Sequence, residues 1–458
     1  MGSNQFPLRF FLDPFGCVKN QVDAETMMAS LNGAGWSVAE GAADADLIII
    51  NSCGFIESAK QESINAVLGW RKMYPDKKIL LAGCLAQRYA KELAESLPEA
   101  DLLFGNADLS GIVKAVVNLA GSSDTVAPPM GNEEENAGGL AGKRPLLSLP
   151  GSAYVKINEG CNNRCTFCSI PLIRGPLRSR SIPDVLAECR ELLGRGIREL
   201  CLIGQDIGSY GKDFSGADSL LQGSLLPKSL LPDLLEALSE LEGDFWVRLL
   251  YIHPDNFPLP ILDIMERDKR FLPYFDLPFQ HGSEKILAAM NRRGTAETYL
   301  SLIETIRSRL PGAVLRSTFL LGFPGETDED FQALLDFQDK ARLDWAGCFA
   351  YSREEDTPAY SMKNRVSKKL TAERKRIVED RQAGISEKQM DRFVGRELDA
   401  LVEEAVDEEE GLYLGRLYCQ APEVDGAAVI NSDWNLAPGS MVRGRVIGRA
   451  GFDLELRI

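Results

Sequence analysis

Histidine is nearly absent from this chain: 458 residues contain only two, His253 and His281. So few imidazoles argue against sites built from several of them, including zinc fingers of the paired Cys and His type. No stretch is apolar over the length of a membrane span, and the amino terminus lacks the basic and apolar segments of a secretory signal. We therefore expect a cytoplasmic protein with no membrane partner. Its ten cysteines should be metal ligands or buried thiols rather than disulfides.

Lysine is missing from the last part of the chain. Residues 393–458 contain six arginines, no lysine and 13 acidic residues, a net charge of −7, and the whole chain carries −16. Nucleic-acid phosphates are bound by clustered basic side chains. The composition therefore favours a basic protein over RNA as the partner of this region.

Three cysteines stand close together in the run CNNRCTFC, namely Cys161, Cys165 and Cys168. A 4Fe-4S cube normally takes four thiolates, so three on one loop leave one iron with an open position for a small molecule. The alternative is zinc, which needs a fourth ligand. No second cysteine pair lies nearby, and neither histidine is at a finger-like distance. The spacing favours a cluster with an open iron.

Three further cysteines, Cys17, Cys53 and Cys84, follow apolar runs in the first 120 residues. Each run alternates with an amphipathic segment, which predicts a doubly wound α/β domain. The carboxyl ends of parallel strands meet at one edge of a sheet, so the three thiols can converge there on a second cluster. Taken singly, each is equally well a small buried hydrophobe. The expected strands are 8–12, 47–50, 79–81 and 102–104, and the expected helices are 21–32, 59–73, 86–96 and 109–119.

These runs resemble a known family. The spacing Cys-x3-Cys-x-aromatic-Cys is similar to the signature of the radical S-adenosylmethionine (SAM) superfamily. The runs GCVKN (16–20), NSCGFI (51–56) and AGCLAQ (82–87) resemble the methylthiotransferases. The resemblance implies two 4Fe-4S clusters and SAM as cofactors. It implies an auxiliary, sulfur-carrying cluster on Cys17, Cys53 and Cys84 and a SAM-cleaving cluster on Cys161, Cys165 and Cys168.

The remaining sequence predicts three more segments. Residues 121–146 lose periodicity and predict a linker, and 147–385 alternate strands with helices as in a partial β/α (radical SAM) barrel. Residues 393–458 predict a small all-β barrel that resembles a TRAM domain. The expected strands of the central segment are 153–157, 199–203, 247–251, 274–277, 315–321 and 345–350.

Polar or glycine-rich runs follow several central strands, at 204–206, 280–283 and 322–327. They resemble the SAM-pocket motifs of the family, and we assign Phe167, Gly204 and Gln205 to SAM on that basis. His281 is either an acid or base or a hydrogen-bonded structural residue. The arginines 174, 178 and 180 either bind a carboxylate or line a solvated turn. Residues 212–229 predict a loop inserted over the barrel mouth.

The predicted activity is radical transfer of a methylthio group. One branch of the family modifies an aspartate of small-subunit ribosomal protein twelve, and the other modifies an adenosine of tRNA. The acidic end of the chain and the run QAPEVDG (420–426) favour the ribosomal branch, with the β-carbon of the aspartate as the site. A low-potential electron donor of the flavodoxin or ferredoxin type is the expected second partner. The alternatives are the tRNA enzyme and a two-cluster electron carrier, for which fully ligated clusters would be expected.

Overall fold

The computed structural model describes residues 8–120, 144–214, 228–406 and 411–458. The predicted linker (121–146) and inserted loop (212–229) therefore lie largely outside the described residues. The chain forms two compact units. Unit 1 comprises Met1–Leu147, Glu159–Asn162 and Ser169–Pro176, and unit 2 comprises Ser148–Asn158, Asn163–Cys168 and Leu177–Ile458. No helix in the described ranges is both long and apolar enough to cross a membrane.

Unit 1 is built on a five-stranded parallel sheet in the order β2-β1-β3-β4-β5. Its strands are β1 (Arg9–Pro14), β2 (Ser37–Val38), β3 (Leu47–Ser52), β4 (Lys78–Gly83) and β5 (Leu102–Phe104). This order reverses direction between β1 and β3. In open α/β sheets, ligands bind beyond the carboxyl ends of the strands at such a reversal.

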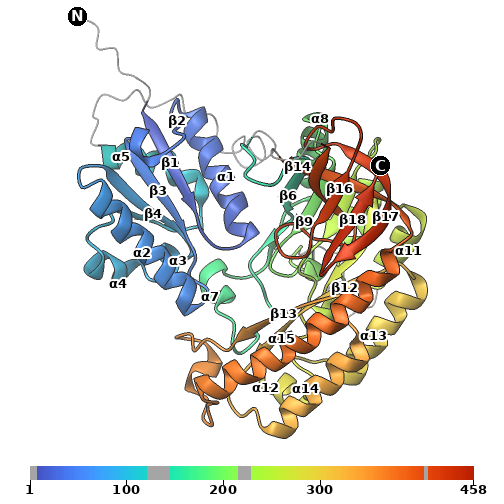
Figure 1. Cartoon of the computed structure of the whole chain (residues 1–458). Helices are drawn as coiled ribbons and strands as arrows, with labels where there is room; N and C mark the ends of the chain where they lie inside the picture. Colours follow the sequence, from blue (N-terminus) through green and yellow to red (C-terminus); the bar gives the residue numbers. More distant parts are fainter. Residues whose placement is uncertain (1–7, 121–143, 215–227, 407–410) are drawn as a thin grey trace, which may run out of the picture. The chain divides into compact units, whose positions relative to one another are not determined.

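Helices cover both faces of this sheet, as the doubly wound prediction requires (Figure 1). Alternate residues of β3 point to opposite faces: Ile49 packs with α1 and α5, and Ile48 and Ile50 pack with α2 to α4. The expected helix over 86–96 is in fact two helices, because Tyr89 interrupts it at φ −122° and ψ 34°. The helices are α1 (Val18–Gly33), α2 (Glu57–Met73), α3 (Cys84–Arg88), α4 (Ala90–Ser96), α5 (Ile112–Ala120) and α7 (Ile170–Arg174).

Unit 2 contains a six-stranded parallel sheet in the order β13-β12-β11-β10-β9-β6. Neighbours in the sheet are neighbours along the chain and helices connect them, which is the arrangement of the predicted partial β/α barrel. Its strands are β6 (Ser152–Lys156), β9 (Glu199–Ile203), β10 (Trp246–Leu249), β11 (Phe271–Asp276), β12 (Val314–Leu321) and β13 (Trp345–Ala350). Its helices are α8 (Ile182–Gly194), α10 (Leu231–Ser239), α11 (Ile261–Arg267), α12 (Glu284–Ala289), α13 (Ala296–Arg309), α14 (Asp328–Ala341) and α15 (Lys368–Met390). The strands β7 (Asn158–Glu159) and β8 (Arg178–Ser179) are short additions.

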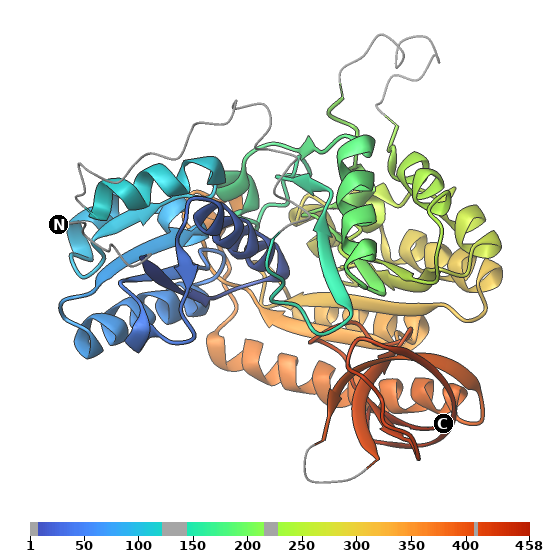
Figure 2. The same ribbon diagram turned by 90° about the horizontal axis from the view of Figure 1, so that it is seen from above.

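The end of the chain closes into a small barrel in the order β14-β15-β16-β18-β17, seen end-on in Figure 2. Buried side chains such as Leu417, Val446 and Leu456 alternate with polar residues along its strands and fill the interior. The strands are β14 (Glu397–Ala405), β15 (Leu412–Leu417), β16 (Ala428–Asn431), β17 (Met441–Ala450) and β18 (Asp453–Arg457).

A buried ion cluster joins this barrel to the parallel sheet of unit 2. Glu199, the first residue of β9, accepts from Arg248 Nε at 2.7 Å and from Arg416 Nη2 at 2.6 Å. Tyr274 donates to Asp425 at 2.6 Å, and Trp345 donates to the Cys419 carbonyl at 2.8 Å. Glu199 and Trp345 are the first residues of β9 and β13, so their bonds to the barrel lie away from the carboxyl ends of these two strands.

Candidate functional site

The thiols of unit 1 lie where the sheet argument places them. Cys17 is the N-cap residue of α1, two residues and a tight turn after β1. Cys53 directly follows β3, and Cys84 is the first residue of α3, directly after β4. All three therefore lie at the carboxyl edge of neighbouring strands, and Cys17 and Cys53 flank the β1/β3 reversal.

Close backbone packing brings these three turns together. A Cβ placed on Gly16, whose φ is +94°, would lie 3.1 Å from the Cβ and 3.4 Å from the Sγ of Cys53. A Cβ on Gly54 would lie 2.7 Å from the carbonyl oxygen of Cys84. Glycine is required at these positions because any side chain would push the cysteine turns apart.

The three thiols differ in exposure: Cys17 is exposed, Cys53 is partly buried and Cys84 is buried. Burial raises the pKa of Cys84 to about 12 and also raises the pKa of Cys53. Without iron both are thiols, and each would release a proton on binding it. The first turn of α1 offers the Cys17 sulfur the positive end of a helix.

Asn20, Asn106 and Arg174 surround the buried sulfur of Cys84. Asn20 donates to the carbonyl of Ser52 at 2.8 Å, and its own oxygen lies 3.1 Å from Cys84 Sγ. Arg174 donates to Cys84 Sγ at 3.1 Å and pairs with Asp23 at 2.6 Å. Sequence reasoning expected Arg174 in a carboxylate site or a solvated turn. The structure instead places it buried beside a thiol.

The loop from Cys161 to Cys168 divides between the units: Cys161 belongs to unit 1, and Cys165 and Cys168 belong to unit 2. In unit 1, the amide of Cys161 donates to the carbonyl of Gly175 at 3.2 Å. In unit 2, the amide of Cys168 donates to the carbonyl of Cys165 at 3.1 Å. Arg164 between them has a φ of +52°, which turns the loop sharply.

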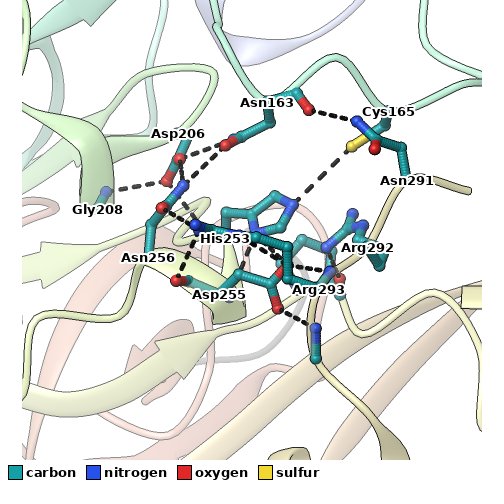
Figure 3. A network of polar contacts seen from close by, with 12 residues as sticks. Asn163, Cys165, Asp206, Gly208, His253, Asp255, Asn256, Asn291, Arg292 and Arg293 are labelled. Atoms are coloured by element: carbon teal, nitrogen blue, oxygen red, sulfur yellow. Dashed lines mark hydrogen bonds and ion pairs between the residues drawn. The ribbon is translucent and has the colours of Figure 1, made fainter. Parts of the chain in front are cut away.

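A polar network fixes the middle of this loop, and Figure 3 shows it. Asn163 donates to Asp206 at 2.8 Å and accepts from Asn256 at 2.8 Å. Asn291 donates to the backbone carbonyls of Asn163 and Arg164 at 3.2 and 3.0 Å. These partners come from segments that follow β9, β10 and α12, so three connections of the barrel hold the loop.

His253 points from this network toward a cysteine (Figure 3). Its Nε2 lies 3.9 Å from Cys165 Sγ, and its Nδ1 accepts from the amide of Asp255 at 3.2 Å. Burial, aided by Arg292 and Arg293, lowers the pKa of His253 well below its usual value. The ring is therefore neutral with its proton on Nε2, directed at the sulfur.

The residues assigned to SAM lie around the same loop. Phe167 packs in a hydrophobic cluster with Ile286, Met290 and Phe323. Gly204 directly follows β9. The backbone there is closely packed, because a Cβ on Gly204 would lie 1.8 Å from Asn158 Oδ1. Gln205 follows it, next to Asp206 of the network. Their role in SAM binding stays a prediction.

His281 fits the structural alternative. It is fully buried, its Nδ1 accepts from the Ser283 amide at 2.9 Å, and its Nε2 lies 3.6 Å from Glu326. Glu326 in turn accepts from Arg374 at 2.6 Å and from the Gly322 amide at 2.8 Å. His281 thus joins the two glycine-rich runs at 280–283 and 322–327.

The set of Cys17, Cys53 and Cys84 suits an iron–sulfur cluster better than a single ion. Within the described ranges, no three His, Cys, Asp or Glu side chains enclose one metal ion. In a cube each thiolate binds a different iron, so its ligands stand further apart than those of one ion. The unit 1 set has only sulfur donors on three glycine-flanked turns, which fits a cube. The assignment of all six thiolates as ligands stays a prediction.

Sequence reasoning missed the polar residues around the sulfurs, above all Asn20, Asp206 and His253. One signal was available for Asn20: it stands three residues after Cys17, so a helix starting at the cysteine brings it back over the turn. Asp206 and His253 meet the cysteine loop across 43 or more positions of sequence, and no local pattern predicts such a contact.

Family models match three parts of the chain. Residues 9–105 match uncharacterized protein family UPF0004, residues 155–337 match the radical SAM superfamily, and residues 394–458 match a TRAM domain. These matches, with the parallel sheets and the closed barrel, confirm the predicted fold class.

Curated relatives match almost the entire chain. Ribosomal protein uS12 methylthiotransferase RimO of Treponema denticola is 47% identical over 472 residues, covering 97% of this chain and 99% of that protein. The RimO proteins of Syntrophomonas wolfei and Clostridioides difficile are 39% and 37% identical, and each match covers at least 96% of both chains.

Solved structures share the fold at low identity. The radical S-adenosylmethionine methyltransferase TsrM from Kitasatospora setae, bound to cobalamin and a 4Fe-4S cluster, matches with a TM-score of 0.53 and 14% identity, covering 77% of this chain and 76% of that one. The cobalamin-dependent S-adenosylmethionine radical enzyme OxsB matches with a TM-score of 0.50 and 13% identity, covering 82% of this chain and 56% of that one.

Proposed function

This chain belongs to the radical SAM methylthiotransferase family of the RimO proteins, and we propose that it inserts a methylthio group at the β-carbon of an aspartate in ribosomal protein uS12. The observation that carries the proposal is the near full-length similarity to relatives named for uS12, at up to 47% identity. The two separate sets of three thiols support the two-cluster chemistry that the reaction needs.

The charge of the small barrel supports a protein substrate. Residues 393–458 carry −7, and Glu397, Asp399, Glu404 and Asp433 are exposed on the described part. Arg396, Arg443, Arg445 and Arg457 are also exposed, so it is the net charge of the whole segment that disfavours the phosphates of RNA and favours a basic polypeptide. A tRNA enzyme would need the opposite charge there, so we take the ribosomal protein as the substrate and the cytoplasm as the place of action.

When bound, the cofactors would supply the chemistry: a cluster on Cys161, Cys165 and Cys168 would donate the electron that cleaves SAM to a carbon radical, and a cluster on Cys17, Cys53 and Cys84 would hold the sulfur to be transferred. The protein supplies order. Hydrogen bonds among Asn163, Asp206 and Asn256 hold the loop, and Phe167 packs against the apolar side chains of Ile286, Met290 and Phe323. The electron is expected from a low-potential flavodoxin or ferredoxin.

The test is an anaerobic assay of the protein loaded with iron and sulfide, given SAM and a reductant, with uS12 and tRNA as separate substrates. Mass spectrometry should find a gain of about 46 Da, one methylthio group replacing hydrogen, on uS12. A Cys168→Ala variant should give no product. Cys348→Ala removes a buried thiol of β13 and should keep full activity. A gain on tRNA alone would refute the substrate assignment.

A further inference from the structure

Arg174 ends the short helix α7 in unit 1 and is only 5% exposed. Its helix begins at Ile170, two positions after Cys168, so it belongs in sequence to the radical SAM loop. Its side chain, however, is directed into the carboxyl edge of the unit 1 sheet, where it contacts residues of α1 and α3. A buried guanidinium at that edge calls for an explanation, because burying an arginine is costly unless its donors are satisfied.

Both terminal nitrogens of the guanidinium have partners. Nη1 donates to Asp23 at 2.6 Å and to Glu159 at 3.3 Å. Nη2 donates to Asn20 at 2.6 Å and to Cys84 Sγ at 3.1 Å. The Asn106 amide either donates its Nδ2–H to Cys84 Sγ at 3.2 Å or, with its oxygen and nitrogen exchanged, accepts from Nε at 3.0 Å. The guanidinium is thus held rigidly, and one N–H of Nη2 is directed at Cys84 Sγ.

Two carboxylates neutralise the charge of Arg174 and hold its side chain. Asp23 is 1% exposed and pairs with Nη1, on the side of the fork away from the sulfur-directed Nη2. Glu159 adds a second carboxylate to Nη1. The carboxylates stabilise the cation through Nη1, while one N–H of Nη2 donates to Asn20 and the other is directed at Cys84 Sγ. Of Cys17, Cys53 and Cys84, the thiol that Arg174 contacts is the buried one, Cys84.

We propose that Arg174 is a positioning residue of the auxiliary cluster: its Nη2–H donates to the Cys84 thiolate, fixes that ligand and raises the reduction potential of the cluster. This inference rests on the proposed auxiliary cluster at Cys17, Cys53 and Cys84. Hydrogen bonds to cluster sulfurs and nearby positive charge both favour the reduced state, which carries one more electron. A charge-assisted N–H···S bond in a buried site supplies both effects.

Arg174 lies close in sequence to the radical SAM thiols. Because α7 follows Cys168 directly, the segment that carries a radical SAM thiol also carries the donor to an auxiliary thiolate. Within unit 1, the amide of Cys161 donates to the carbonyl of Gly175, which immediately follows Arg174.

The test isolates the auxiliary cluster. The parent is the full chain with Cys161, Cys165 and Cys168 all changed to alanine, loaded with iron and sulfide without air. Iron and sulfide are counted, and the midpoint potential is measured by a redox titration followed by electron paramagnetic resonance. Arg174→Gln should keep the cluster and shift the midpoint to a more negative potential, with Arg174→Lys between it and the parent. Arg144→Gln, which removes another buried arginine that pairs with α1 at Glu25, should not shift it.

A second signature separates a hydrogen bond from mere packing. In deuterated buffer, electron–nuclear double resonance of the reduced parent should show an exchangeable deuteron coupled to the cluster, and Arg174→Gln should lose it. A parent-like potential and an unchanged deuteron signal in Arg174→Gln would overturn the proposal. If that variant loses its iron, Arg174→Lys carries the test, and a parent-like midpoint there would overturn it. A parent that binds no iron would refute the auxiliary cluster itself, and this inference with it.

Discussion

Replacing Arg416 by methionine should loosen the small barrel from the rest of unit 2. Arg416 lies on β15, is 3% exposed, and donates to Glu199 Oε2 at 2.6 Å and to Oε1 at 3.2 Å. Glu199 is fully buried at the start of β9; its other cationic partner is Arg248 at 2.7 Å, and the Ser152 hydroxyl also donates to it at 2.9 Å. Methionine keeps most of the volume and removes the charge, so Glu199 would keep only one of its two cations and Glu403 would lose the arginine with which it pairs.

Two estimates give the size of the effect. Despite burial, the two arginines lower the pKa of Glu199 from 4.5 to about 2. A shift of that size corresponds to about 3 kcal/mol of stabilisation of the ionised carboxylate. Removing one partner of a buried ion pair typically costs about 3–5 kcal/mol. Since Arg248 remains, we expect the lower end, about 3 kcal/mol.

Native-state hydrogen exchange of the amides of β14 and β15 measures this opening directly. Arg443→Met is the matched control, because Arg443 pairs with Asp399 on the exposed face of the same barrel at 3.1 Å and should contribute under about 1 kcal/mol. Cleavage of SAM should survive in both variants, because Glu199 is at the far end of β9 from Gly204. Equal opening free energies for the two variants would refute the reasoning.

Three further predictions concern the thiols, the glycines and acid. Cys53→Ala should keep SAM cleavage and lose methylthio transfer, whereas Cys165→Ala should lose both activities. Each variant should bind about four fewer irons than the parent. Equal loss of SAM cleavage in the two variants would contradict the division of roles between the clusters. Gly54→Ala should impair the auxiliary site, because its Cβ would meet the Cys84 carbonyl at 2.7 Å, whereas Gly33→Ala, with no atom within 4 Å, should bind normal iron. The ionised Glu199 stabilises the fold fully above about pH 4.5, and this contribution is lost as the pH falls toward about 2. The thermal unfolding temperature of Glu199→Gln should therefore depend less steeply on pH in that range than that of the parent.

The sequence predicted the parts of the fold that local pattern controls. The apolar runs of β3 and β4 are buried on both faces, and alternation with helices fixed a parallel sheet. The placement of Cys53 and Cys84 at its carboxyl edge followed. The strand β2 was not predicted, because two residues are too few to show an alternation of apolar and polar side chains. The expected elements of the central segment did not include the helix α14, although Thr327 and Asp330 form a capping box at its start.

The surroundings of the sulfurs were less predictable. Arg174 reaches Cys84 across 90 positions, and His253 reaches Cys165 across 88. Such contacts depend on how loops pack after the sheets have formed, and single residues in loops leave no periodic trace. The sequence could supply the ligands and the class of cofactor, but the donors around them became visible only in three dimensions.

The most direct test of the proposed chemistry follows hydrogen rather than mass alone. A uS12 substrate labelled with deuterium at the β-carbons of its aspartates is treated with the loaded protein, SAM and reductant, and both peptide and 5′-deoxyadenosine are analysed by mass spectrometry. We predict that the modified aspartate gains the methylthio group and loses one deuterium, which appears in 5′-deoxyadenosine. A modified aspartate that keeps all its β-deuterium, or a methylthio group found only on tRNA, would contradict the account.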